Sequence, residues 1–230
     1  MIDIHSHVLP LVDDGSKSME ASMTMIKEAV SIGVTDLFCT PHFMKVRNYL
    51  STAQANQKAY DQLTEAIRKA GYSIRLHLAN EIYYTIDTMR QLKAGSILPM
   101  GKSNKVLVEF SMSEPEEDIV EAIHNLKAAG YVPIIAHPER YPYIEKISDY
   151  EIMKKMGALI QINAASVIGK YGVPTQKLCL KLIKIGLVDF IASDVHEFRV
   201  NYLKFAYDFI KSQFNETVAN HLFSNPIILE

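Results

Sequence analysis

Two histidines separated by one residue stand near the start of the chain, in the segment His5-Ser6-His7. They follow a short apolar stretch, residues 1–4, that is typical of a strand. Because alternating residues of a strand point to the same side, both imidazoles face one way and are placed to bind one metal ion. Taken alone the pair is weak evidence, since a solvated histidine pair at a strand end is the simpler interpretation.

An acidic turn follows this pair, Asp13-Asp14-Gly15. Aspartate before glycine is typical of a turn, which would be a purely structural role. The closeness of both carboxylates to His7 along the chain leaves three other roles open for them: metal ligand, water-orienting group or acid.

Residue types that bind metals recur where the other predicted strands end. These residues are His42, Glu81, Glu109, His137, Asp194 and His196. If the strands share one direction, these side chains converge with His5 and His7 on one mouth of the fold. Imidazole and carboxylate suit manganese, iron or zinc, and eight ligands exceed the needs of one ion. The sequence therefore predicts two or three ions in a site suited to phosphoryl transfer.

The remaining histidines and both cysteines receive structural interpretations. His77, His124 and His221 lack strand-end placement, so we interpret them as surface residues of strands or helices. Cys39 and Cys179 lie in apolar surroundings, which is typical of buried free thiols. Neither cysteine stands in a Cys-x5-Arg loop, which argues against a phosphatase with a cysteine nucleophile.

Strand-like runs alternate with helical runs along the whole chain. The strand-like runs are residues 1–4, 34–40, 73–80, 106–108, 131–136, 158–162 and 187–192. The helical runs are residues 19–32, 52–70, 86–92, 116–129, 148–156, 175–185, 202–214 and 216–223. Such alternation predicts parallel βαβ units in an α/β fold, and we expect a barrel or a barrel-like parallel sheet.

Composition narrows the class of protein. The 230 residues contain no linker-like or low-complexity segment, so we predict one domain, residues 1–230. The net charge of −2 argues against a broad nucleic-acid or membrane footprint. No apolar run is long enough to span a bilayer, and no signal peptide is visible, so we predict a cytoplasmic protein without membrane insertion.

Several of these motifs together resemble a known superfamily. They are Met1-Ile-Asp-Ile-His-Ser-His-Val-Leu-Pro10, Asp13-Asp14-Gly15, Thr40-Pro41-His42, Ala136-His-Pro-Glu-Arg140, Gln161-Ile-Asn163 and Ser193-Asp-Val-His196. The chain resembles the PHP (polymerase and histidinol phosphatase) superfamily. Within it, the chain is similar to the manganese-dependent protein-tyrosine phosphatases of CpsB/YwqE type from bacterial capsule and exopolysaccharide synthesis.

The resemblance implies a fold and a site. The fold is a distorted seven-stranded (β/α) barrel with a trinuclear metal centre. The ligand roles fall on His5, His7, His42, Glu81, Glu109, His137, Asp194 and His196. Arg140 takes the role of phosphate contact, with an ion pair to Glu139 as its structural alternative. A second family arginine usually follows the last histidine closely, and Arg199 stands near that position but displaced from it.

These roles predict hydrolysis of a phosphomonoester by attack of metal-activated hydroxide on phosphorus. Arg140 would neutralise the phosphoryl oxygens, and Asp14 or a bound water would supply a proton to the leaving group. The resemblance implies a protein-tyrosine phosphatase whose substrate is the tyrosine-rich tail of a bacterial tyrosine autokinase. Mn²⁺ is the metal it favours, with iron, zinc and magnesium as alternatives, and homo-oligomers occur in the family.

Three other functions remain open at the level of sequence. A small-molecule phosphatase, such as one for histidinol phosphate, would use the same chemistry in a deep, narrow pocket. A metal-dependent nuclease would need a basic groove, which the near-neutral charge does not suggest. A regulatory protein would use the ions structurally, and the presence of Arg140 beside a full ligand set argues against it. Lys45, Arg47 and Arg199 are candidates for a cationic rim or for ordinary solvated charges.

Overall fold

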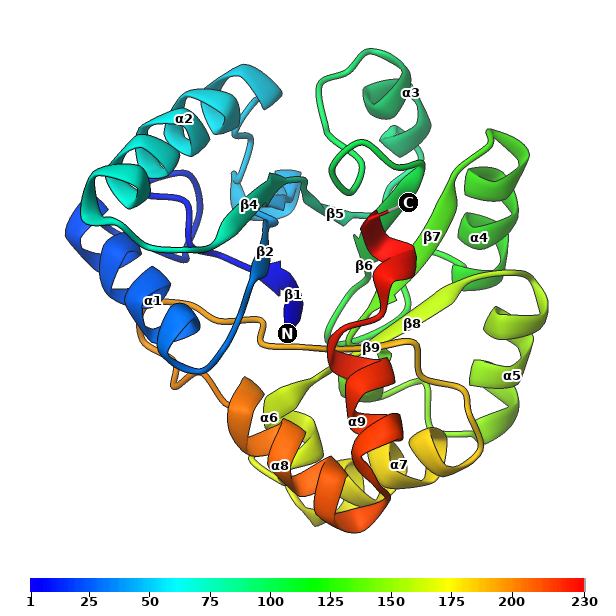
Figure 1. Ribbon diagram of the computed structural model, residues 1–230. Helices are drawn as coiled ribbons and strands as arrows, with labels where there is room; N and C mark the ends of the chain where they lie inside the picture. The colour runs from blue at the N-terminus through cyan, green and yellow to red at the C-terminus, as the bar shows by residue number, and fades with distance from the viewer. Residues whose placement is uncertain (230) are drawn as a thin grey trace.

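Parallel strands surrounded by helices make up residues 1–229, which the computed structural model describes (Figure 1). The strands are β1 (Ile2–Ser6), β2 (Asp36–Cys39), β3 (His42–Phe43), β4 (Arg75–Leu78), β5 (Glu81–Tyr83), β6 (Lys105–Glu109), β7 (Val132–Ala136), β8 (Leu159–Asn163) and β9 (Phe190–Ala192). The α-helices are α1 (Met19–Ser31), α2 (Ala53–Ala70), α3 (Thr88–Lys93), α4 (Ile119–Ala128), α5 (Ile147–Lys155), α6 (Ala164–Val167), α7 (Val173–Lys184), α8 (Leu203–Gln213) and α9 (Glu216–Phe223). Three 3-10 helices are η1 (Lys45–Arg47), η2 (Pro138–Arg140) and η3 (Pro226–Leu229).

Each predicted strand-like run overlaps an observed strand, and each predicted helical run overlaps an observed helix. The helix expected from residue 116 begins at Ile119, because the Asp118 side chain accepts hydrogen bonds from the first turn and so caps it. Helix α6 and the strands β3 and β5 were not predicted. They are too short to show a periodicity of their own in the sequence.

The predicted α/β fold with parallel strands is present, but the predicted seven-stranded barrel is not confirmed. The strands form two sheets, one in the order β1-β2-β4 and one in the order β3-β5-β6-β7-β8-β9. The division follows from interruptions between β2 and β3 and between β4 and β5, so that β3 and β5 lie beyond the predicted runs 34–40 and 73–80. At the first interruption stands Pro41, which has no N–H for a strand ladder. His42 and Glu81 therefore begin short strands instead of following long ones.

The first and last strands meet without forming a regular ladder. Ser6 and Val195 make an isolated parallel bridge just beyond β9. The N–H of Asp194 donates to the carbonyl of His5 at 2.9 Å, and the N–H of His7 donates to Val195 at 3.0 Å. These bonds join the end of β1 to the segment that follows β9, at the carboxyl ends of the strands.

Two apolar clusters stabilise this arrangement. The larger one lies between strands and the helices around them, and it includes Ile26 of α1 and Leu182 of α7. The smaller one is formed by inward-facing strand residues such as Phe38 and Leu107, and Ile228 of η3 packs against them. In the view of Figure 1 the C-terminal segment, coloured red, passes in front of the strands near β6. The strands are therefore packed against apolar side chains in both clusters.

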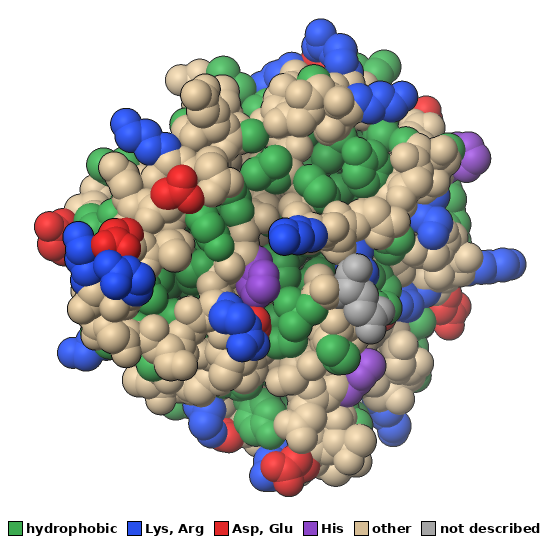
Figure 2. Space-filling view, turned by 45° about the horizontal axis from the view of Figure 1, so that its top comes forward, with side chains coloured by type: hydrophobic (Ala, Val, Ile, Leu, Met, Phe, Trp, Pro, Cys, Tyr) green, Lys and Arg blue, Asp and Glu red, His purple; other side chains and the backbone are tan. Residues whose placement is uncertain are grey.

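Cys39 and Cys179 are buried and free, as predicted. Among the described helices, none is both long and apolar enough to cross a membrane. On the face drawn in Figure 2, lysine and arginine side chains are scattered in small groups among acidic ones and do not form a continuous basic track.

Candidate metal centre

All eight predicted ligand side chains are buried near one pocket at the carboxyl ends of the strands. The pocket has a volume of about 500 Å³. Its lining includes Asp14, His42, Glu109, His137, Asp194 and His196, with Arg47, Arg140 and Arg199 and the apolar residues Met44, Val46, Phe110 and Met112. The predicted convergence of strand-end residues on one mouth is therefore observed.

Glu81, the first residue of β5, lies at the centre of the cluster. Its Oε2 atom is 3.1 Å from Nε2 of His5, 3.2 Å from Nε2 of His7 and 2.8 Å from Nδ1 of His42. Its Oε1 atom is 2.9 Å from Nε2 of His137. One carboxylate therefore faces four imidazoles, which is the arrangement expected of a group that bridges metal ions.

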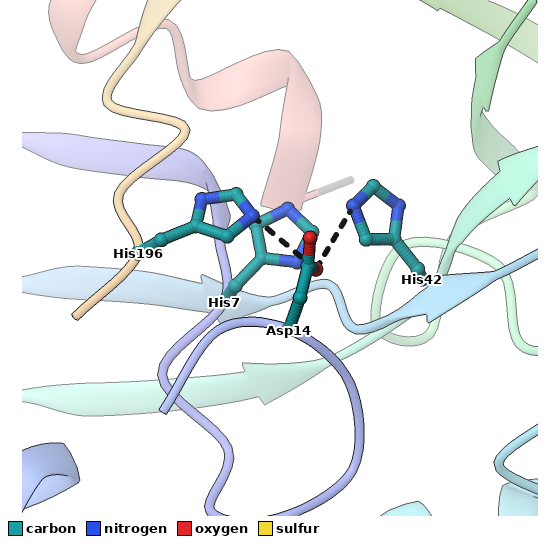
Figure 3. A group of neighbouring side chains, drawn as sticks. All are labelled: His7, Asp14, His42 and His196. Atoms are coloured by element: carbon teal, nitrogen blue, oxygen red, sulfur yellow. Dashed lines mark ion pairs between the residues drawn. The ribbon is translucent and has the colours of Figure 1, made fainter. Parts of the chain in front are cut away.

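Asp14 joins three histidines in a second group, which Figure 3 shows with its carboxylate between His42 and His196. The Oδ1 atom of Asp14 is 3.5 Å from Nε2 of His42 and 3.6 Å from Nε2 of His196. His7 completes the group, since its donor atom lies within 4.8 Å of the others. This geometry favours the metal-ligand alternative for Asp14.

Two further groups of donors satisfy the same distance criterion. One consists of His5, His7 and Glu81, and the other of His42, Glu81 and Glu109. The Oε1 atom of Glu109 lies 2.9 Å from Nδ1 of His42. Because His7, His42 and Glu81 are shared between groups, neighbouring ions would be linked by common ligands.

The Nδ1 atoms of three histidines make polar contacts with neighbouring residues outside the cluster of Nε2 atoms. His7 Nδ1 donates to Asp13 at 2.7 Å, and His5 Nδ1 lies 3.0 Å from the side-chain oxygen of Gln161. Nδ1 of His196 donates to the backbone oxygen of Asp194 at 3.1 Å. Such bonds fix the orientation of each ring, so that Nε2 points into the cluster.

The carboxylates of the cluster are held in the ionised form. Burial by itself would raise the pKa of Glu81, but the charges of His5 and His42 hold that pKa well below its ordinary value. The pKa of Asp194 is likewise held well below its ordinary range, against the effect of burial, by His5 and His7. Ionised oxygens are the form that binds a cation.

Asp14 and His196 are also in forms that can bind a metal. The interaction with His196, whose Nε2 atom is 3.6 Å from Oδ1 of Asp14, lowers the pKa of Asp14 far below its ordinary value, which does not suit the proton-donor role predicted for this residue. Burial lowers the pKa of His196, with His7 acting in the same direction, and so favours the neutral imidazole. For His42, burial acts to lower the pKa, but Glu81 and Glu109 raise it to about 10.

Several inward-facing donor atoms lack a hydrogen bond within residues 1–229. They are Asp14 Oδ1, His42 Nδ1, Glu81 Oε2, Glu109 Oε1 and His196 Nε2. Neighbouring atoms of this set lie 2.8 to 3.6 Å from one another without forming hydrogen bonds, which is costly for buried polar atoms, so a native site with five of them needs an explanation. Metal ions in the cluster would satisfy all five, and the donor set therefore fits the predicted ions.

Two residues of the cluster have an unusual backbone conformation. His137 has φ of 37° and Asp194 has φ of 50°, in the left-handed region that residues other than glycine rarely adopt. Each stands just after the end of its strand, β7 or β9. The strain turns each side chain towards the cluster, a pattern that recurs at functional sites.

Arg140 and Arg199 approach the same oxygen atom of the cluster. Nη1 of Arg140 is 3.4 Å from Oδ2 of Asp194, and Nη1 of Arg199 is 3.2 Å from it. The displacement of Arg199 along the sequence therefore does not remove it from the site. The alternative ion pair between Arg140 and Glu139 is wrong, because Glu139 points into the core.

Glu139 instead ties η2 to the start of α6. Its Oε1 atom accepts hydrogen bonds from the N–H of Asn163 at 2.9 Å and from the hydroxyl of Ser166 at 2.6 Å. The Asn163 side chain in turn donates to Asp194 at 2.8 Å. From the sequence, no role is assigned to Gln161 or Asn163, although they alternate along a strand that ends at the site, and Glu139 is considered only as an ion-pair partner of Arg140.

The predicted structural histidines lie apart from these groups. His77 is 3.0 Å from Oδ1 of Asp36 and stacks on Phe38, outside the three donor groups found within residues 1–229. His124 and His221 lie on α4 and α9.

Comparison with known proteins gives a match over the whole described chain. The family described as "Capsular polysaccharide synthesis, CpsB/CapC" matches residues 1–229. The protein CapC of Staphylococcus aureus is 36% identical over 200 residues, which cover 85% of this chain and 77% of CapC. The tyrosine-protein phosphatase CpsB of Streptococcus agalactiae serotype V is 32% identical over 232 residues, covering 97% of this chain and 95% of CpsB.

A solved structure matches closely as well. It comes from the crystal structures of YwqE from Bacillus subtilis and CpsB from Streptococcus pneumoniae, described as unique metal-dependent tyrosine phosphatases. The TM-score is 0.88 at 28% sequence identity, and the match covers 95% of this chain and 90% of the other.

Proposed function

The chain belongs to the CpsB/CapC family, and from that premise we propose that it is a metal-dependent protein-tyrosine phosphatase of capsule or exopolysaccharide synthesis. The observation that carries the proposal is one pocket in which ionised carboxylates, imidazoles and two arginines meet. Anionic and neutral donors suit cations, and arginines suit the oxygens of a phosphate.

We propose His5, His7, Asp14, His42, Glu81, Glu109, His137, Asp194 and His196 as the residues that hold the ions. Two or three ions, most suitably Mn²⁺, fit the three overlapping donor groups. When bound, such ions lower the pKa of water so that hydroxide is available near neutral pH, and they offset charge on the phosphoryl group.

The protein's own residues then bind and orient the substrate. Arg140 and Arg199 present guanidinium groups to the phosphoryl oxygens from the side of Asp194. Asp13, Gln161 and Asn163 keep the donor groups in position through the hydrogen bonds described above. A tyrosinate leaving group has a conjugate acid with a pKa of about 10, so it needs less protonation than an alkoxide.

The side chains that line the pocket support an aryl phosphate as the substrate. Apolar side chains of Met44, Phe110 and Met112 lie in the same lining as the donors and arginines. They would pack against a tyrosine ring while the phosphate reaches the ions. We propose a phosphotyrosine protein as the partner, specifically the tyrosine-rich tail of a bacterial tyrosine kinase.

We also propose that residues 1–230 form a single domain and that the protein is located in the cytoplasm.

The test is phosphate release from a phosphotyrosine peptide and from histidinol phosphate, measured side by side. Chelator-treated protein would be assayed with and without added Mn²⁺. We expect manganese-dependent release from the peptide and much slower release from histidinol phosphate. Release from histidinol phosphate alone would keep the chemistry and overturn the substrate. Release from neither, with metal shown to be bound, would overturn the enzymatic proposal.

A further inference from the structure

Tyr171 lies directly against Arg140, outside the donor cluster. The Cζ atom of the Arg140 guanidinium is 4.7 Å from the centroid of the Tyr171 ring. This is the geometry of a cation–π contact, in which the negative face of the ring attracts the cation. Arg140 thus has Asp194 on one side of its guanidinium and an aromatic ring on another.

The segment that carries Tyr171 is a tight loop, Gly169-Lys170-Tyr171-Gly172, between α6 and α7. Gly169 has φ of 81° and Gly172 has φ of 97°, so both ends of the loop adopt a conformation that favours glycine. The N–H of Lys170 donates to Ala165 at 2.9 Å, and the N–H of Gly172 donates to Gly169 at 3.1 Å. The loop is thereby a defined turn that presents the Tyr171 ring.

A second cation–π contact fixes the other side of this loop. The ammonium group of Lys170 lies 5.0 Å from the centroid of the Tyr202 ring. Tyr202 stands at the start of α8, at the end of the loop that carries Arg199. The loop of residues 169–172 therefore touches both segments that supply an arginine to the pocket.

We propose that Tyr171 is a positioning residue for phosphate binding, whose ring holds the Arg140 guanidinium in the orientation that receives the phosphoryl oxygens. The proposal rests on the proposed phosphatase function for its catalytic consequence, but the contact itself can be tested without activity. Arg140 has a long side chain with a large entropy to lose, so a ring that restricts it lowers the cost of ordering it when phosphate binds.

The ring, and not the hydroxyl, carries the contact. Within residues 1–229 the Tyr171 hydroxyl makes no hydrogen bond, and the only side-chain hydrogen bond to this residue is from Thr175 to its backbone oxygen. Replacement by phenylalanine keeps the aromatic face, whereas leucine removes it with little change in apolar size. Tyr171→Phe and Tyr171→Leu are therefore a matched pair.

The first measurement is kinetic, with p-nitrophenyl phosphate as substrate and inorganic phosphate as competitor of the manganese-loaded protein. For Tyr171→Leu we expect kcat/KM to fall and the phosphate inhibition constant to rise, each by about fivefold to tenfold. Tyr171→Phe should stay within about twofold of the parent protein. Tyr207→Leu is the control, because Tyr207 faces Lys204 at 5.7 Å in a similar contact on α8, away from the pocket.

The second measurement does not depend on enzymatic activity. Phenylglyoxal modifies exposed guanidinium groups, and peptide mapping gives its rate at Arg140. We expect faster modification of Arg140 in Tyr171→Leu than in Tyr171→Phe, while the rate at the exposed Arg68 is equal in both. If the parent protein hydrolyses no phosphate ester, the proposed function fails but this measurement still decides the contact.

Equal phosphate inhibition and equal modification rates in the leucine and phenylalanine variants would overturn the proposal. A loss of thermal stability in Tyr171→Leu without either change would also overturn it, because the ring would then serve only the stability of the loop.

Discussion

Several side chains at this site contact the same oxygen atom, Oδ2 of Asp194. Arg140 and Arg199 come from separate segments, yet both approach Oδ2 of Asp194, which also accepts a hydrogen bond from Asn163. Three positive or partly positive donors around one oxygen hold the Asp194 carboxylate in one orientation. The same two guanidinium groups are exposed to the pocket, where a phosphate would meet them.

Replacement of Arg140 by alanine should lower kcat/KM for phosphotyrosine peptide by about 100-fold, because a charge-assisted contact to the phosphoryl group is lost. Metal content and thermal stability should persist, since Arg140 is not among the donor groups. Arg68→Ala, an exposed arginine of α2, is the control and should leave the rate unchanged. Equal activity in Arg140→Ala would refute the role given to this arginine.

Replacement of His42 by alanine should reduce the metal bound per chain. His42 belongs to two of the three donor groups, so its loss affects more than one ion. Loss of a residue that hydrogen-bonds to a metal ligand typically weakens metal affinity by about 10- to 100-fold, and loss of a ligand itself should weaken the affinity at least as much. Metal would be counted by atomic spectroscopy, with His124→Ala as control, and an unchanged count would remove His42 from the site.

At the scale of elements, the turn after β1 sets the position of Asp13 and Asp14. Gly15 donates to Asp13, and Ser16 donates to the backbone oxygen of His7 at 3.1 Å, so the chain folds back against the strand it has just left. A Cβ atom on Gly15 would lie 2.1 Å from the His7 oxygen and 2.4 Å from the His7 Cβ. Only glycine fits this close approach.

Gly15→Ala should therefore destabilise the protein by about 1–3 kcal/mol, the usual cost of overpacking, and should lower metal content because His7 and Asp14 move apart. The matched control is Gly33→Ala, where φ is 86° and no atom lies within 4 Å of the added Cβ. That variant should show only the backbone cost, about 1–2 kcal/mol, and a full complement of metal. Denaturant unfolding and metal analysis of both variants would check this, and normal metal content in Gly15→Ala would contradict it.

The opposite end of the strands is held by an ion pair that depends on pH. Asp36 of β2 accepts two hydrogen bonds from Arg75 of β4, at 2.7 and 2.6 Å. Although burial acts in the other direction, these bonds and one with His77 lower the pKa of Asp36. A carboxyl whose pKa is lower in the folded state contributes stability above its unfolded pKa of about 3.9, and that stability is lost as the pH falls through the folded value.

Asp36→Asn should thus cost about 1–2 kcal/mol of unfolding free energy at pH 7. The difference from the parent protein should shrink as the pH falls from about 4 through the lowered pKa of the folded state, below which the parent carboxyl is protonated as well. Denaturant unfolding at a series of pH values would measure it. A constant difference at all pH values would show that the charge of Asp36 has no part in the effect.

At the scale of the molecule, the site depends on the whole chain being folded. Its donors come from strands β1, β3, β5 and β6 and from the segments after β1, β7 and β9, and the first and last of these strands and segments meet through the bond from Asp194 to His5. Five imidazoles and four carboxylates are gathered in a small volume. Ions that bind there and not to the unfolded chain should therefore stabilise the entire fold.

Removal of metal by a chelator should lower the melting temperature by about 5–10 °C. This follows from a stabilisation of about 2.7 kcal/mol at a metal concentration one hundred times Kd, and a shift of about 2–4 °C per kcal/mol for a chain of this size. Added Mn²⁺ should restore the original value. The same melting temperature with and without metal, in protein shown to bind it, would contradict a link between the site and the fold.

The amino-acid sequence determined the residue types at the strand ends, the order of strands and helices, and the family. These properties are local, because alternation, helical periodicity and short motifs can be read within a few consecutive residues. His5, His7 and the other predicted ligands lie together in one buried cluster, and five of the eight line the pocket. The parallel direction of the strands was also accessible, since helical connections between strands imply it.

Only the tertiary structure decided which donors face one another. The grouping of Asp14 with His7, His42 and His196, the approach of Arg199 to Asp194 and the inward turn of Glu139 depend on contacts between distant segments. The division into two sheets likewise depends on how short strands pair across the fold. Such contacts are set by the packing of the whole chain, and no local pattern in the sequence encodes the distances between their atoms.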